Sequence, residues 1–146
     1  MTEEQITLIL IEWLEQKDWS IVSFDYPESG TGTRIAPDEK IGCEESDSFI
    51  PDIVAVKRQI AVFFENKDRF YKSDFEKVEV LKKSDCYKKG INDLLKDFLV
   101  KNIFYGIGLI TEETEKIEQN KNKTDFIVLL DPKTQKVIVS HGKRIF

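Results

Sequence analysis

The amino-acid sequence predicts an α/β domain, because a capped helical pattern opens the chain and two adjacent β-rich runs lie near its middle. Further strand-like and helical segments follow to the end of the chain. With 146 residues and 40% hydrophobic content, the chain is long enough for one core and too short for two domains of ordinary size. We therefore expect residues 1–146 to form a single domain.

The N-terminal third is expected to form a helix, a strand and a long loop. Thr2 is a typical N-cap, and apolar side chains then recur at helical spacing to about Lys17. Residues 19–26 form a strand-like run. The polar stretch 27–48 has neither pattern, and a loop of that length is unusual in a compact domain unless it serves a function.

The middle of the chain predicts a β-hairpin. Residues 50–57 and 60–66 are rich in Val, Ile, Ala and Phe, and only Arg58 and Gln59 separate them. A turn of two residues joins antiparallel strands and sets which residues face each other across them.

Helices and strands alternate in the second half. A helix is expected from a capping Ser73, and a second from about residue 85, with Gly90 as a bend between them. Strands are expected at 103–110, 125–130 and 136–140, and the charged segment 112–122 is either helix or loop.

The formal net charge of −5 argues against a nucleic-acid partner, but the excess acid is unevenly distributed. Residues 1–56 hold three basic and thirteen acidic side chains, whereas residues 57–97 hold eleven and eight. The net charge therefore does not exclude nucleic-acid binding by the later part of the chain.

The two cysteines, Cys43 and Cys86, share no short spacing with each other or with His141, which predicts free thiols and neither a zinc site nor a disulfide framework. No leader-like segment precedes the first helix, and the apolar runs are too short to span a membrane. We expect a cytoplasmic protein with no membrane partner.

Three charged residues converge at one end of the predicted hairpin. The two-residue turn places Asp52 directly opposite Glu65, and strand alternation directs Lys67 to the same face as Glu65. Opposed carboxylates destabilise a strand pair unless a cation lies between them. The alternative is a solvated strand end bearing ordinary charges.

Oxygen ligands of this kind suit Mg²⁺ or Mn²⁺, and the backbone carbonyl of Asn66 is a further candidate ligand. An ion held by Asp52 and Glu65 would activate water and neutralise charge on a phosphoryl group, while Lys67 would either orient that water or stabilise developing negative charge. This combination predicts a nuclease that hydrolyses phosphodiester bonds.

Pro51-Asp52, twelve intervening residues and then Glu65-Asn66-Lys67 resemble the signature of the PD-(D/E)XK nuclease superfamily. The resemblance covers roughly residues 2–100 and implies a restriction-endonuclease-like core, in which a helix precedes a mixed sheet flanked by helices. It also implies that an acid of the first helix joins the metal site, with Glu12 as the candidate and Glu15 as the substitute.

Within the superfamily, the helix, the strand and the Ser-Gly-containing loop are similar to archaeal Holliday junction resolvases and to small restriction endonucleases. The acidic insertion at 38–48 departs from the compact, basic resolvase pattern, so specificity for junctions does not follow from the resemblance.

Four basic residues are the predicted nucleic-acid contacts: Arg34, Lys40, Lys72 and Lys88. The alternative for Arg34 and Lys40, which lie in an acidic segment, is that they only offset neighbouring charge. The lysine-rich surroundings of Lys72 and Lys88 fit an exposed helix face equally well. The leading hypothesis is a DNA endonuclease that acts as a homodimer. The alternatives are a non-catalytic subunit of a DNA-processing or defence complex, with a partner protein, and a nuclease for RNA or branched DNA.

Overall fold

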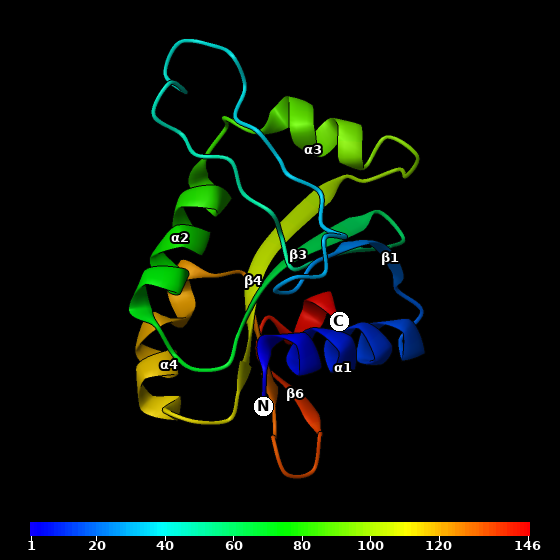
Figure 1. Ribbon diagram of the computed structural model, residues 1–146, viewed down its shortest axis with the longest axis vertical. Coiled ribbons are helices and arrows are strands. Elements are labelled where there is room, and N and C mark those ends of the chain that lie inside the picture. The colour runs from blue at the N-terminus through cyan, green and yellow to red at the C-terminus, as the bar shows by residue number, and fades with distance from the viewer.

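The computed structural model describes all 146 residues and shows one six-stranded sheet with helices on both faces (Figure 1). The strands are β1 (Ser20–Phe24), β2 (Ile53–Lys57), β3 (Ile60–Lys67), β4 (Asn102–Ile110), β5 (Phe126–Leu130) and β6 (Val137–His141). The helices are α1 (Glu3–Gln16), α2 (Lys72–Lys83), α3 (Lys88–Leu94) and α4 (Thr114–Asn120), with short 3-10 turns η1 (Lys121–Lys123) and η2 (Lys143–Ile145).

The strands lie in sequence order, β1 to β6. The β3–β4 and β4–β5 pairs are parallel and the outer pairs are antiparallel, so the sheet is mixed. This confirms the predicted α/β class. None of the helices has the length and apolar character that crossing a membrane requires.

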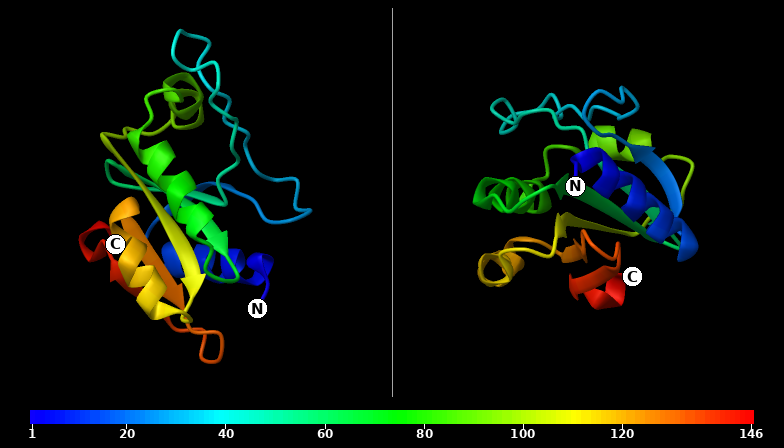
Figure 2. Two further views of the ribbon diagram at one scale, coloured as in Figure 1. Left: turned by 90° about the vertical axis from the view of Figure 1, so that its left-hand side faces the viewer. Right: turned by 60° about the horizontal axis from the view of Figure 1, so that its bottom comes forward.

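Helix α1 covers one face of the sheet, and α2, α3 and α4 cover the other (Figures 1 and 2). The Thr2 hydroxyl accepts a hydrogen bond from the N–H of Gln5, whose side chain accepts one from the N–H of Thr2, so the predicted cap is present. Ile6, Leu10 and Leu14 follow at intervals of four residues and are fully buried against the sheet.

The β2–β3 hairpin has the predicted turn and register. Arg58 and Gln59 form the turn, and Val54 pairs with Phe63 and Val56 with Ala61. These four side chains belong to one buried cluster on the α3 face of the sheet. The hairpin is therefore part of the core, and its open end is held in a defined position.

Two details of the helices differ from the predictions. Helix α2 begins one residue before Ser73, with Tyr71 as N-cap, so Ser73 does not cap it. Gly90 lies inside α3, and the break between the helices is at residues 84–87. A Cβ atom at Gly90 would lie 2.8 Å from the side chain of Ile35, so this glycine allows the loop to pack closely on α3.

The prediction of free thiols is wrong, because Cys43 and Cys86 form a disulfide. The bond joins the long loop between β1 and β2 to the segment between α2 and α3. Sequence spacing could not reveal this pair, because 43 residues separate the two cysteines and only tertiary packing brings them together.

Other contacts hold the same loop in place. Ile35 and Phe49 form an antiparallel bridge, and the Asp38 carboxylate accepts hydrogen bonds from the N–H groups of Lys88 and Lys89 at the start of α3. The Tyr87 hydroxyl donates to a loop carbonyl. The long loop is thus part of the folded structure.

We predict that replacing both cysteines by serine lowers the free energy of unfolding by about 2–4 kcal/mol, because the disulfide restricts the unfolded chain. Urea denaturation of the oxidised wild type and of the Cys43→Ser, Cys86→Ser double variant measures this difference. A reductant should lower the stability of the wild type and leave the double variant unchanged. Equal stabilities of the two oxidised proteins would contradict the prediction.

Candidate active site

The carboxylate of Asp52 lies where β2 begins and β3 approaches its end. The N–H of Asp52 donates to the carbonyl of Phe64 at 2.9 Å, and Oδ2 of Asp52 accepts from the N–H of Asn66 at 2.7 Å. The recorded strand pairing ends with Ile53 and Phe64, and Asp52 lies just beyond it. The negative charge of Glu65 acts on the Asp52 carboxyl group, so the two carboxyl groups are close to each other. The structure thus agrees with the predicted juxtaposition.

Two ammonium groups approach the carboxylate of Glu65. Nζ of Lys67 lies 3.7 Å and Nζ of Lys77 lies 3.4 Å from Oε1 of Glu65. Lys67 also lies 3.3 Å from Oε1 of Glu3, in the first turn of α1. The end of β3 therefore receives charged groups from helices on both faces of the sheet.

Asp74, in the first turn of α2, completes the cluster. The charges of Lys67 and Lys77 act on its carboxyl group, and its Oδ2 atom is buried without a hydrogen-bond partner. Burial raises the pKa of Asp74 above its ordinary value, and the two lysines only partly offset this. The carboxyl group is therefore incompletely satisfied by the protein.

The environment of Asp52 disfavours its charged form. Burial, followed by the negative charge of Glu65, raises the pKa of Asp52 from 3.8 to about 8, against the opposing effects of the Asn66 N–H and of Lys67. Two adjacent carboxylates in a partly buried site repel each other, so ionisation of Asp52 destabilises the folded protein. A nearby cation would offset this repulsion.

The environment of Lys67 favours its charged form. Burial disfavours its charged form, but the carboxylates of Glu65, Asp74 and Glu3 outweigh burial and raise the pKa of Lys67 above its ordinary value. Lys67 therefore carries a positive charge at neutral pH. Its ammonium group can donate hydrogen bonds and balance negative charge, but it has no lone pair with which to accept a proton.

Asn66 meets this site through its backbone. Its side chain is buried on the opposite face, where Nδ2 donates to the hydroxyl of Thr7 at 3.1 Å. The N–H and C=O groups of one strand residue point to the same side of the strand, so the carbonyl oxygen faces the side on which Asp52 lies. This is compatible with the predicted ligand role of the carbonyl.

The structure does not bring Glu12 to the cluster, so its prediction as the helix acid is wrong in position. Glu12 is exposed, lies 3.4 Å from Nε2 of Gln16 and lines a depression with Gln135 near β6. The acid of α1 that lies at the cluster is Glu3, and the helical rise places it about 13.5 Å from Glu12 along the helix axis. Glu15, the substitute, is exposed near the far end of the same helix.

Sequence reasoning also missed Asp74 and Lys77. Acidic residues in the first turns of α1 and α2 were visible as Glu3 and Asp74, but such acids are common because they complement the helix dipole. Only the packing of both helix N-termini at the end of β3 shows that these acids face Lys67.

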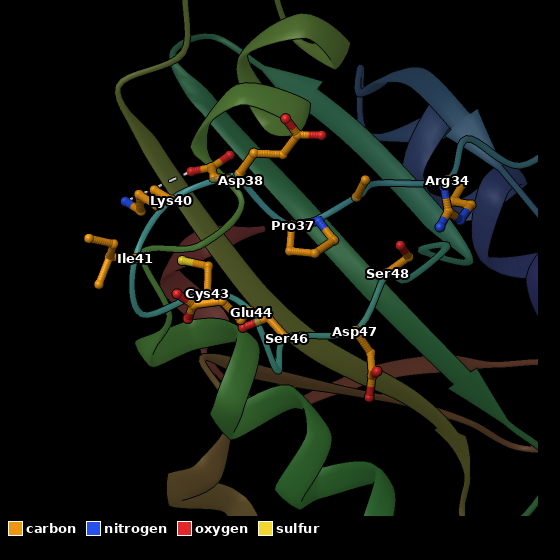
Figure 3. A pocket seen from close by; sticks show the side chains of 12 residues that line it. Arg34, Pro37, Asp38, Lys40, Ile41, Cys43, Glu44, Ser46, Asp47 and Ser48 are labelled. Atoms are coloured by element: carbon orange, nitrogen blue, oxygen red, sulfur yellow. Dashed lines mark ion pairs between the residues drawn. The ribbon is translucent and has the colours of Figure 1, made fainter.

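Two of the predicted nucleic-acid contacts lie in an acidic setting. Arg34 and Lys40 line a cavity of about 960 Å³ formed by the 34–48 loop, together with four acidic side chains: Asp38, Glu39, Glu44 and Asp47 (Figure 3). Nζ of Lys40 lies 3.9 Å from both Asp38 and Asp85. This surface therefore disfavours contact with a phosphate backbone.

The other two predicted contacts occupy helix starts. Lys88 is exposed at the beginning of α3, and its backbone N–H is held by Asp38. Lys72 is exposed at the beginning of α2, with Nζ 3.9 Å from Glu76. Neither joins the cluster around Asp52.

Comparisons of the chain with models of protein families, with curated proteins and with solved structures find no match.

We predict that, in EDTA, the free energy of unfolding falls as pH rises from about 4 to 8. The raised pKa of Asp52 means that folding favours its protonated form, a contribution that is fully present below 3.8 and is lost as pH passes through about 8. The Asp52→Asn variant should lack this part of the pH dependence and melt above the wild type at alkaline pH. Asp97→Asn, at an exposed position, is the control. Identical pH profiles for wild type and Asp52→Asn would contradict the prediction.

Proposed function

We propose that this chain is a metal-dependent endonuclease that hydrolyses phosphodiester bonds of DNA. The observation that carries the proposal is the pair of adjacent carboxylates, Asp52 and Glu65, with the charged amine of Lys67 beside them. Acid, acid and lysine at one strand end form a donor set suited to a hard cation and an anionic substrate.

The residues fit a divalent ion. Burial and Glu65 raise the pKa of Asp52 to about 8, which means that the site disfavours the negative charge of Asp52. A cation of charge +2 would offset this unfavourable charge. All candidate ligands are oxygen atoms, from Asp52, Glu65 and the carbonyl of Asn66, which favours Mg²⁺ or Mn²⁺ over softer metals. Glu3 and Asp74 add two further carboxylates around Lys67.

A bound ion of this kind would lower the pKa of coordinated water and polarise a phosphate group. The protein's own contribution is to hold positive charge where negative charge develops. Lys67 is protonated, so we assign it charge stabilisation or orientation of the attacking water, and not the removal of a proton. Lys77 lies 3.4 Å from the same Glu65 oxygen and supplies a second positive charge.

The arrangement of elements supports a PD-(D/E)XK-like core. Helix α1 precedes a mixed sheet that has helices on both faces, which is the order the motif implies. Because one active site cuts one strand at a time, cleavage of both strands of a duplex is best served by two copies of the chain, and we propose a homodimer for that substrate.

A second candidate function is a non-catalytic subunit that binds a partner protein. The acid-rich cavity of the 34–48 loop favours it, because four carboxylates on a surface held by the disulfide would attract a basic protein segment and repel DNA. The intact set of Asp52, Glu65 and Lys67 favours the enzyme.

The deciding experiment measures cleavage of plasmid, single-stranded DNA, four-way-junction DNA and RNA with Mg²⁺ or Mn²⁺. We expect metal-dependent cleavage by the wild type and a loss of roughly 10²–10³ in rate for Lys67→Met, which removes the charge and retains the aliphatic chain. Asp52→Asn should abolish both cleavage and the heat of Mg²⁺ binding in calorimetry.

Lys101→Met is the matched control, because Lys101 is exposed just before β4 and makes no ion pair. It should cleave at the wild-type rate. A wild type that binds no divalent ion and cuts none of the substrates would refute the enzyme and favour the non-catalytic subunit.

A further inference from the structure

A groove between α2 and α4 is lined with lysine and holds no acidic side chain. It has a volume of about 520 Å³, and six residues line it: Phe70, Lys72, Lys116, Gln119, Asn120 and Lys123. The two larger cavities each include four acidic residues in their lining. Of these three cavities, this groove is the one suited to an anion.

Segments distant in sequence build this groove. Lys72 begins α2, Lys116 and Asn120 lie one helical turn apart on α4, and Lys123 ends η1. Helix α2 packs against η1, and Figure 2 shows α2 and α4 side by side on the same face of the sheet. The grouping of the lysines is therefore a consequence of tertiary packing.

Each of the three lysines has an exposed acidic partner, and Lys116 pairs with Glu113 at 3.3 Å. Oδ1 of Asn120 accepts a hydrogen bond from Nζ of Lys123 at 2.9 Å. Lys72 and Lys123 share one carboxylate, that of Glu76, at 3.9 Å each, and Glu76 remains 55% exposed. Ion pairs with carboxylates this exposed are weak and compete poorly with a phosphate group.

The groove lies close to the candidate active site. On α2, Asp74 and Lys77 are three residues apart and face the cluster at Glu65, whereas Lys72 and Glu76 are four apart and lie on another flank. The two sites are thus separated by roughly the width of one helix, about 10 to 12 Å.

The first turn of α2 contributes to both sites, with Lys72 in the groove and Asp74 in the cluster. Its N-cap, Tyr71, makes no side-chain hydrogen bond to the first turn of the helix. Free N–H groups and the helix dipole at this position favour an anion passing from one site to the other. The aromatic ring of Phe70 in the groove wall offers a surface for a base or a sugar.

We propose that this groove binds the phosphate backbone of the nucleic-acid strand that the active site cleaves, on one side of the scissile bond. The assignment of a substrate strand rests on the proposed nuclease function. Three ammonium groups and the amide of Gln119 match the charge and the hydrogen-bonding needs of phosphate oxygens and read no base sequence. The groove therefore supplies affinity and orientation, and not sequence specificity.

The test measures binding of fluorescent single-stranded and duplex DNA by anisotropy, with Ca²⁺ in place of Mg²⁺ to suppress cleavage. The variant replaces Lys72, Lys116 and Lys123 by glutamine. We expect an increase in Kd of about tenfold or more near physiological salt, and a decrease of roughly 2 in the slope of log K against log salt, because three phosphate contacts are lost.

The matched control replaces Lys133, Lys136 and Lys143 by glutamine, which removes the same charge from the β5–β6 turn and the C-terminal segment. It should bind like the wild type. Glu76→Gln should act in the opposite direction and tighten binding, because it releases Lys72 and Lys123 from their shared carboxylate. Melting curves verify that all variants are folded.

The outcomes separate this proposal from the nuclease itself. Wild-type affinity and wild-type KM in the triple lysine variant would refute binding of the substrate strand by the groove, even if the protein cleaves DNA. Equal weakening in the control, or no binding of nucleic acid by the wild type, would overturn it as well. Binding that the triple variant loses, in a protein that does not cleave, would support the groove and refute the nuclease.

Discussion

The pairing of β2 with β3 is the constraint on which the candidate site depends. Two residues close the turn, and the side chains of both strands are buried in a different cluster on each face of the sheet. A slip of one residue would exchange these two sets of core side chains, so the register has no freedom to shift. The N–H of Asn66 then fixes the carboxylate of Asp52 at the open end of the hairpin. Core packing, rather than the charged residues, therefore holds two carboxylates side by side.

The same arrangement has an energetic cost. Asp52 beside Glu65 is disfavoured in its ionised form, and the N–H of Asn66 and the charge of Lys67 compensate only in part. Functional sites often retain such unfavourable contacts, since groups that relieve them, a cation or a substrate, then bind with a gain in stability. On the side of α2, the buried Oδ2 atom of Asp74 has no hydrogen-bond partner, which is also unfavourable.

The two regions of surface around α2 differ in charge. The loop joined to α2 and α3 by the disulfide presents carboxylates, whereas the groove between α2 and α4 presents lysines. A phosphate backbone would be repelled by the first region and attracted by the second. Arg34 and Lys40, placed among acids, are therefore poorer candidates for DNA contact than Lys116 and Lys123, which no sequence pattern distinguished.

Local patterns in the sequence determined the capped first helix, the hairpin, its register and hence the meeting of Asp52, Glu65 and Lys67, because turn length and strand alternation act over a few residues. Contacts between distant segments were beyond such patterns. The disulfide, the replacement of Glu12 by Glu3 and the lysine groove each depend on how helices and the loop pack across the sheet. That packing is settled by the burial of the whole core, which no short stretch of sequence contains.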